Sequence, residues 1–138
     1  MEIGRLCIDK QGSDPFLLLS AFNYLRSIIS SHQIDFIFGC TSFAGVDNPR
    51  HLVSLSSLEK NQLADSIFPI EKKSPSVLHI KQEILGATGN KKAINFLPPL
   101  LKFYLRLGGK VSDHAVIDRD LDTLHVFTYV DLKGKKFN

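Results

Sequence analysis

The sequence predicts an α/β fold, in which helices pack against a β-sheet. Three observations carry this prediction. A strand-like segment at residues 2–9 is followed by a helix with a clear start signal, and that helix is followed by a short apolar run at residues 34–40. A second helix and two further strands are expected between residues 98 and 132. This alternation of strands and helices is typical of α/β proteins.

The N-terminal part is expected to form one strand–helix–strand unit. Asp14 and Pro15 supply an N-cap and a first-turn proline, so a helix is predicted from there to about Ser31. Its buried stripe recurs at three- and four-residue spacing: Leu18, Phe22, Leu25 and Ile29. A crossover helix connects strands that run in the same direction, so segments 2–9 and 34–40 are predicted to be parallel neighbours.

The middle of the chain is expected to hold less regular structure. Residues 41–49 are interpreted as a loop. Leucines at positions 52, 55, 58 and 63 suggest one or two short helical segments up to Asp65. A short strand is predicted at residues 77–80 and a glycine-containing linker at residues 86–92.

The C-terminal part has the clearest boundaries. Pro98 and Pro99 are expected to begin a helix, and Gly108 and Gly109 to end it. Strands are predicted at residues 111–117 and 123–132. Both faces of the second strand are mostly apolar, which predicts a central position in the sheet.

Length and composition limit the class of protein. With 138 residues, 43% hydrophobic and 22% charged, one globular domain is expected at residues 1–132, followed by a basic tail at residues 133–138. No apolar run approaches the ~20 residues of a membrane-spanning helix, and no secretory signal is recognised, so a cytoplasmic location is expected. The net charge of +3 suits an acidic partner or an anionic membrane surface, and it falls short of a nucleic-acid-binding surface.

The cysteines and histidines predict no metal site. Cys7 and Cys40 do not form a Cys-x-x-Cys pair, and the five histidines are scattered. On the residues alone, both cysteines are interpreted as small core thiols. His114 and His125 are interpreted as packed or surface residues rather than bases. Composition and pattern alone predict no specific function.

Several segments together carry a family resemblance. The most specific is the block at residues 97–102 (LPPLLK) with residues 104–108 (YLRLG). The others are Glu2-Ile3-Gly4-Arg5 with Cys7, then residues 38–43 (FGCTSF), 116–118 (VID) and 126–127 (VF). Together they resemble the ornithine-acyl[acyl carrier protein] N-acyltransferases, which are lyso-ornithine lipid synthases also labelled hemolysin-like. The resemblance covers residues 2–132 and implies the C-terminal portion of a longer enzyme.

The resemblance implies a GNAT-like three-layer fold that is truncated at its N-terminus. It implies transfer of a (3-hydroxy)fatty acyl group from acyl carrier protein to the α-amine of ornithine, in ornithine-lipid biosynthesis. It implies no bound cofactor, because the acyl-phosphopantetheine of the carrier protein is the donor substrate. The implied partners are the carrier protein and an amino-acid acceptor, with peripheral contact at the inner face of the membrane. The alternative is a non-catalytic remnant or one half of a split acyltransferase.

The resemblance also implies two catalytic residues. Glu2 and Arg5 fit a Glu-x-x-Arg pattern, in which Glu2 would be the base or an amine-orienting carboxylate. Arg5 would organise the site or hold a substrate carboxylate. A regular strand places positions i and i+3 on opposite faces, so a bulge at Gly4 would be needed to bring them together. The alternative is a solvated Glu2 and an ion-paired Arg5.

By the same analogy, the two parallel strands part and hold the pantetheine arm between them. Their unpaired backbone groups would bond the amides of the arm. The expected contacts are Cys7, Ile8, Lys10, Cys40, Thr41 and Ser42. The loop at residues 10–14 lacks the glycine-rich pattern of acetyl-coenzyme A users, and its Asp14 cap repels an anion, which favours a carrier-protein donor. Lys10 is alternatively a simple turn lysine.

A basic stripe is expected on the second helix. Lys102 and Arg106 are four residues apart and therefore share one helix face. This stripe would meet an acidic carrier protein or lipid phosphates. Its alternative interpretation is an exposed, solvated helix face.

Overall fold

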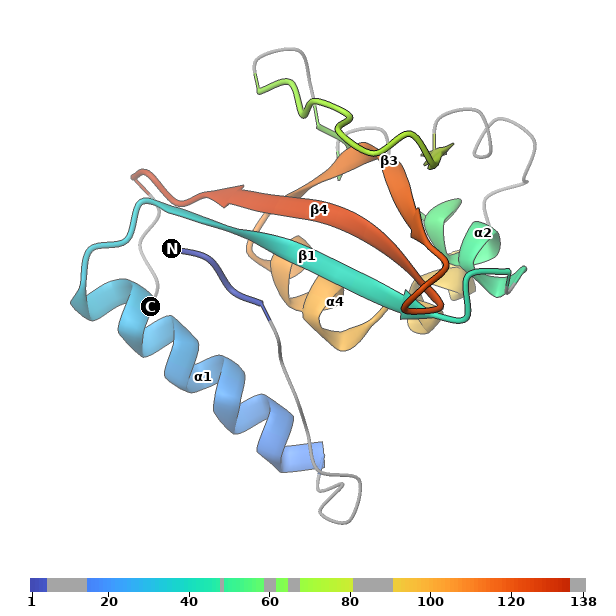
Figure 1. Cartoon of the computed structure of the whole chain (residues 1–138). Coiled ribbons are helices and arrows are strands. Elements are labelled where there is room, and N and C mark those ends of the chain that lie inside the picture. Colours follow the sequence, from blue (N-terminus) through green and yellow to red (C-terminus); the bar gives the residue numbers. More distant parts are fainter. Residues whose placement is uncertain (5–14, 48, 59–61, 65–67, 81–90, 135–138) are drawn as a thin grey trace.

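A computed structural model describes residues 1–4, 15–47, 49–58, 62–64, 68–80 and 91–134. The helices are α1 (Pro15–Ser31), α2 (Arg50–Leu55), the 3₁₀-helix η3 (Lys91–Phe96) and α4 (Pro99–Arg106). The strands are β1 (Phe36–Ala44), β2 (Val77–His79), β3 (Lys110–Asp118) and β4 (Thr123–Asp131). Figure 1 shows the strands as one twisted sheet with α1 and α4 on the same side of it. The predicted α/β class is confirmed.

The sheet has the strand order β1-β4-β3-β2, and each neighbouring pair is antiparallel. Strand β4 therefore lies between β1 and β3, as its apolar faces predicted. At the outer edge of β1, the N-terminal segment Met1–Gly4 adds a parallel bridge between Glu2 and Phe38. At this bridge, the predicted parallel neighbourhood of the two N-terminal segments is confirmed.

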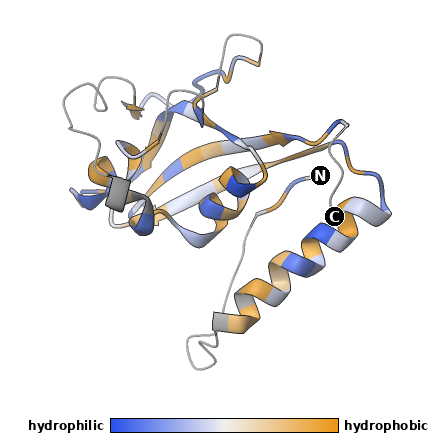
Figure 2. Ribbon diagram, turned by 180° about the vertical axis from the view of Figure 1, so that it is seen from behind, coloured by the Kyte–Doolittle hydropathy of each residue, from blue (hydrophilic) through white to orange (hydrophobic). Residues whose placement is uncertain are grey.

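Helix α1 begins at Pro15 and ends at Ser31, as the sequence predicted. Of its predicted stripe, Ile29 is buried and Phe22 and Leu25 pack against the same cluster. The Phe22 ring stacks on Phe103 of α4 with centroids 4.3 Å apart. Figure 2 shows apolar and polar residues alternating along α1, as expected of a helix with one face on a core.

Helix α4 follows Pro98, and Pro99 occupies its first turn, where a missing N–H costs nothing. The backbone turns out of the helix at Gly108, whose φ of +77° suits glycine. The N–H of Gly109 donates to the carbonyl of Tyr104 at 2.9 Å. The predicted proline start and glycine end of this helix are both confirmed.

The hydrophobic core forms two adjoining clusters on one face of the sheet. The first includes Phe43, Leu55, Leu101, Val111 and Val126. The second includes Ile3, Ile29, Ile37, Tyr104 and Val130. Helices α1, α2 and α4 all contribute to this face, so the described residues form two layers rather than the three that the resemblance implied. The second helical layer of that expectation is not formed by the described part of the chain.

Aromatic side chains gather on the opposite face of the sheet. They are Phe36, Phe38, Phe68, Phe127 and Tyr129, with successive ring centroids 4.8–6.2 Å apart. The Phe68 residue is 45% exposed. This face is therefore lined with apolar rings that solvent still reaches.

Strand β1 differs most from its prediction. It begins at Phe36 and continues to Ala44, so the loop predicted from residue 41 was wrong over its first four residues. The burial pattern alternates along these residues, with Thr41 and Phe43 buried and Ser42 exposed. Antiparallel pairing with β4 as far as Thr123 holds them extended. Helix η3 likewise occupies residues that were partly interpreted as a linker, whose residues 86–90 lie outside the described chain.

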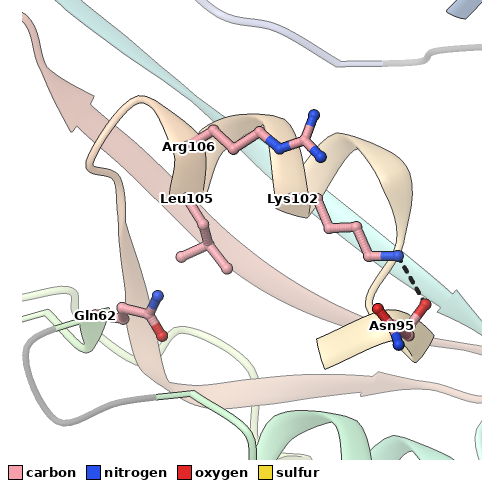
Figure 3. Close-up of a pocket in the computed structure, with 5 residues that line it drawn as sticks. All are labelled: Gln62, Asn95, Lys102, Leu105 and Arg106. Carbon is pink, nitrogen blue, oxygen red and sulfur yellow. Dashed lines mark hydrogen bonds between the residues drawn. The ribbon is translucent and has the colours of Figure 1, made fainter. Parts of the chain in front are cut away.

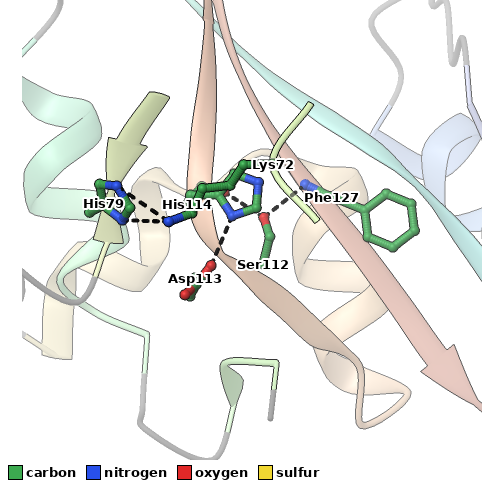
Figure 4. Close-up of polar contacts among 6 residues, drawn as sticks. All are labelled: Lys72, His79, Ser112, Asp113, His114 and Phe127. Atoms are coloured by element: carbon green, nitrogen blue, oxygen red, sulfur yellow. Dashed lines mark hydrogen bonds and ion pairs between the residues drawn. The ribbon is translucent and has the colours of Figure 1, made fainter. Parts of the chain in front are cut away.

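A bulge interrupts β3 between Val111 and Ala115. The hydroxyl of Ser112 accepts the N–H of Phe127 at 3.2 Å and donates to the carbonyl of His114, which secures the irregular segment (Figure 4). His114 is buried, with Nδ1 2.8 Å from an oxygen of Asp113. His114 is therefore a packed residue of the sheet, as predicted.

Candidate active site

The parallel ladder between the N-terminal segment and β1 is short. The N–H of Phe38 donates to the carbonyl of Met1 at 3.0 Å, and the N–H of Ile3 donates to the carbonyl of Phe38 at 2.8 Å. In a continued ladder, the Ile3 carbonyl would accept the N–H of Cys40. It accepts the hydroxyl of Tyr104 instead, at 3.1 Å. Between the described residues the ladder therefore ends at Ile3.

Gly39 lies at the point where the ladder ends. A methyl group added to Gly39 would overlap the carbonyl oxygen of Ile3 and would lie 2.7 Å from the hydroxyl oxygen of Tyr104. Only a residue without a Cβ allows the three groups to approach this closely. Gly39 and Tyr104 together mark the end of the described ladder, which we call the apex.

Beyond the apex, the outer edge of β1 carries peptide groups that have no partner among the described residues. Phe38 directs its N–H and C=O toward the N-terminal segment, and every second residue of a strand directs its peptide groups to the same side. Cys40 and Ser42 therefore present theirs to that side as well. Neither has a backbone hydrogen bond there to any residue that the structure describes. This edge is a short row of donors and acceptors for an extended ligand.

Two further ionisable side chains, the Cys40 thiol and the Tyr104 hydroxyl, lie near Glu2 at the apex. Burial raises the pKa of the Cys40 thiol, and the negative charge of Glu2 raises it further. The pKa of Tyr104 is also raised, by burial first and then by the charges of Cys40 and Glu2. Both groups therefore stay protonated at neutral pH. A protonated thiol is a poor nucleophile, so Cys40 is not suited to carry an acyl group covalently.

The structure brings together some of the predicted site residues. Glu2 and Cys40 lie within electrostatic reach of each other at the apex. Cys40 is exposed on the sheet face opposite the core, so its interpretation as a core thiol was wrong. Ser42 is exposed on the same strand, and its hydroxyl lies 2.8 Å from Nδ1 of His125. Thr41 points into the core, where its hydroxyl has no hydrogen-bond partner among the described residues. The remaining candidates lie outside the described residues: Arg5, Cys7, Ile8 and Lys10.

Tyr104 is the residue of this site that the sequence did not single out. It is fully buried and lies among leucines on the apolar stripe of α4, so its spacing resembles that of a core residue. A buried tyrosine needs a partner for its hydroxyl. That requirement was the only signal in the sequence that it contacts more than the core.

The basic stripe of α4 borders a separate pocket of about 330 Å³. Figure 3 shows Lys102 and Arg106 on the same side of the helix, with Leu105, Gln62 and Asn95 completing the lining. The ammonium group of Lys102 donates to the carbonyl of Asn95 at 2.7 Å. Lys102 is therefore fixed to η3, and the part of the lining that the structure describes holds two cations and no carboxylate.

Within the described ranges, no group of three or more His, Cys, Asp or Glu residues is placed to hold a metal ion. No helix in the same ranges is long and apolar enough to cross a membrane.

Comparisons with known proteins identify relatives along the whole chain. The L-ornithine N(alpha)-acyltransferase of Brucella abortus is 32% identical over 137 residues, which are 96% of this chain and 47% of the relative. The enzymes of the same name from Rhizobium meliloti and Rhodobacter capsulatus are 33% and 31% identical, over 100% and 97% of this chain. No family model and no solved structure matches the chain. The chain spans about half the length of the curated relatives it matches. It is therefore homologous, along its whole length, to about half of an L-ornithine N(alpha)-acyltransferase, as the sequence resemblance indicated.

Proposed function

We propose that this chain carries the thioester-binding edge and reaction centre of an N-acyltransferase. The reaction moves a (3-hydroxy)fatty acyl group from acyl carrier protein to the α-amine of ornithine, in the biosynthesis of ornithine lipid. Homology to the L-ornithine N(alpha)-acyltransferases supports the reaction class. The observation that carries the proposal is that the described parallel ladder ends at Ile3, so that Cys40 and Ser42 at the edge of β1 have no backbone partner there among the described residues.

The pantetheine arm of the donor would lie along this edge. The arm contains amide groups, and the peptide groups of Cys40 and Ser42 are placed to bond them as a neighbouring strand would. Hydrogen bonds of this kind position the thioester without recognising its acyl chain. Holding both reactants in place supplies much of the rate acceleration for a bimolecular reaction. Of the expected contacts on the second strand, we retain Cys40 and Ser42.

The chemistry is aminolysis of a thioester. The neutral amine nitrogen attacks the acyl carbonyl carbon, the N–C bond forms, and the C–S bond breaks. The attacking nitrogen must lose a proton, and the departing thiolate gains one. The Glu2 carboxylate lies at the apex and would hold or deprotonate the amine, while Arg5 would organise the site. The protonated hydroxyl of Tyr104 would keep the Ile3 carbonyl turned away from the slot.

We propose a GNAT-like fold for the complete enzyme, because a parallel strand pair that parts at one sheet edge is the feature expected to admit the donor arm. Acyl carrier protein would be the acidic partner, and the exposed Arg106 suits contact with it or with lipid phosphates. The enzyme would act in the cytoplasm, at the inner face of the membrane.

Acyl transfer by the purified chain tests the proposal directly. The protein is incubated with 3-hydroxyacyl carrier protein and ornithine, and the product is measured by mass spectrometry beside a full-length relative. Formation of N-acylornithine, with at least a roughly tenfold loss in Glu2→Gln, is expected. Glu71→Gln is the matched control, since Glu71 is exposed in a segment away from the apex. No product from this chain while the relative turns over would reject it as a complete enzyme.

The alternative is one half of a split acyltransferase. The aromatic face of the sheet, with Phe68 45% exposed, is the surface that a complementary polypeptide would cover. Under this alternative, activity appears only when the missing half of a relative is added as a separate chain. Activity of the chain alone would exclude it.

A further inference from the structure

We propose that Ser42 and His125 form a proton relay that receives the proton of the attacking amine. This inference rests on the proposed function and assigns a step that the resemblance left to Glu2. Its starting point is a hydrogen-bonded chain of side chains on the face of the sheet that carries Cys40.

The relay is built from two neighbouring strands. The Ser42 hydroxyl oxygen lies 2.8 Å from Nδ1 of His125. Nε2 of the same ring lies 2.8 Å from the hydroxyl oxygen of Thr123 and 3.7 Å from a carboxylate oxygen of Asp118. Both ring nitrogens therefore have a partner. With the proton on Nε2, the ring faces the Asp118 carboxylate, and Nδ1 is free to accept the hydroxyl proton of Ser42.

The register of the sheet explains this pairing. Ser42 and His125 lie directly opposite each other in the β1–β4 ladder. Phe38 directs its N–H and C=O toward the N-terminal segment. Ser42 lies four residues further along β1 and directs its peptide groups to the same side, away from His125. Such non-hydrogen-bonded pairs bring side chains closest together. The contact is therefore fixed by strand geometry.

The relay lies beside the proposed donor arm. Ser42 follows Cys40 by two residues on the same face of β1, a distance of about 7 Å along a strand. The peptide groups of Ser42 also belong to the unpaired edge that would bind the arm. Ser42 is exposed, so an amine that approaches the thioester from this face meets its hydroxyl.

The relay carries one proton from the attacking amine through Ser42 to His125. As the amine nitrogen bonds to the acyl carbon, its proton passes to the oxygen of Ser42, and the hydroxyl proton of Ser42 passes to Nδ1 of His125. The resulting imidazolium faces the Asp118 carboxylate. The C–S bond breaks, the thiolate takes a proton from solvent, and His125 returns its proton to solvent through its exposed edge. Glu2 then orients the amine and does not deprotonate it.

Among the described residues, few titratable groups lie near the relay. Asp118 approaches from β3, Cys40 lies beside Ser42 on β1, and Glu2 lies beyond Cys40 on the N-terminal segment. His79 on β2 contacts Lys72 at 3.3 Å (Figure 4). His79 is a partly exposed strand histidine outside the relay and is therefore the matched control.

The test is kcat/KM for ornithine, measured at one fixed pH for the wild-type chain and its variants. His125→Gln and Ser42→Ala are each expected to lower kcat/KM about 100-fold, while His79→Gln leaves it unchanged. The double variant is expected to lose no more than either single variant, because both residues serve one proton transfer.

Other outcomes separate the two proposals. An unchanged kcat/KM in His125→Gln, or losses that simply add in the double variant, overturns the relay and leaves the proposed function intact. No turnover by the wild-type chain, either alone or with the missing half of a relative added, overturns the proposed function, and the relay with it. The ring ¹⁵N shifts of His125 give a readout without turnover. A neutral ring protonated on Nε2 is required, and a proton on Nδ1 overturns the relay whatever the activity.

Discussion

The hydroxyl of Tyr104 donates a 3.1 Å hydrogen bond to the main-chain carbonyl of Ile3, which lies 101 residues earlier in the sequence. This bond ties α4 to the N-terminal segment at the end of the described ladder. The carbonyl that it occupies is the one that a continued ladder would use. The end of the described ladder is therefore coupled to the packing of α4.

Removing the Tyr104 hydroxyl is expected to destabilise the fold. In Tyr104→Phe the Ile3 carbonyl loses its buried donor, which costs about 1–3 kcal/mol of unfolding free energy. Urea unfolding measures the loss. Tyr24→Phe, at a position 70% exposed, is the control and is expected to change stability by less than about 0.5 kcal/mol. Equal stability of the two variants would contradict a stabilising role for the hydrogen bond between Tyr104 and Ile3.

The same tyrosine predicts a loss of stability in alkali. Its pKa is raised by burial, so the folded chain keeps a proton that the unfolded chain releases above about pH 10. The unfolding free energy therefore falls as the pH rises beyond that value. Unfolding measured from about pH 8 to about pH 11 is expected to decline less steeply in Tyr104→Phe. An unfolding free energy that falls equally with pH in the variant and the wild type would contradict the raised pKa of Tyr104.

Gly39 is predicted to accept no side chain. In Gly39→Ala the new methyl group meets the Ile3 carbonyl and the Tyr104 hydroxyl, which costs about 1–3 kcal/mol and displaces the N-terminal segment. Gly4→Ala is the control, because its methyl group meets Glu2 Oε1 at an ordinary 3.6 Å. Thermal unfolding of both variants decides the point. A Gly39→Ala variant as stable as Gly4→Ala would show that the apex is less tightly packed.

The Cys40 thiol is predicted to react slowly at neutral pH. Burial and the Glu2 charge raise its pKa, so little thiolate is present below the alkaline range. Replacing Glu2 with Gln removes the smaller of these causes, lowers the pKa of Cys40 and speeds alkylation at a fixed pH. Iodoacetamide rates in a Cys7→Ser background, which leaves Cys40 as the reacting thiol, measure the change. An alkylation rate unaffected by Glu2→Gln would show that the charge of Glu2 does not influence the Cys40 thiol.

The Thr128 hydroxyl is predicted to destabilise the core. It is buried without a hydrogen-bond partner among the described residues, and an unpartnered buried hydroxyl is unfavourable. Thr128→Val keeps the shape of the side chain and is expected to raise the unfolding free energy by about 1 kcal/mol. Thr128→Ser keeps the hydroxyl and removes the methyl group, so it is expected to lower stability. Destabilisation by valine would indicate that the hydroxyl has a partner.

Local signals in the sequence predicted much of the fold. Pro15 marks the start of α1, and the prolines and glycines around α4 mark both of its ends, because these residues restrict or free the backbone by themselves. The central position of β4 followed from its two apolar faces. The strand–helix–strand order predicted the parallel approach of the N-terminal segment to β1.

The features that were missed depend on distant pairing. Residues 41–44 have the composition of a loop and are extended because β4 pairs with them. Tyr104 has the spacing of a core residue, and its contact with Ile3 exists only after the chain has folded. The Ser42–His125 contact joins residues 83 positions apart, so only the strand register reveals it.

The unpaired edge of β1 can be tested most directly by amide NMR of the whole chain, titrated with a 3-hydroxyacyl pantetheine thioester. The amides of Cys40 and Ser42 are expected to exchange freely with solvent before the thioester is added, and to shift and become protected after it is added. The amides of Thr41 and Phe43, which face β4, are expected to stay protected throughout. Cys40 and Ser42 amides that are protected before the thioester is added, or that do not respond to it, would contradict the account.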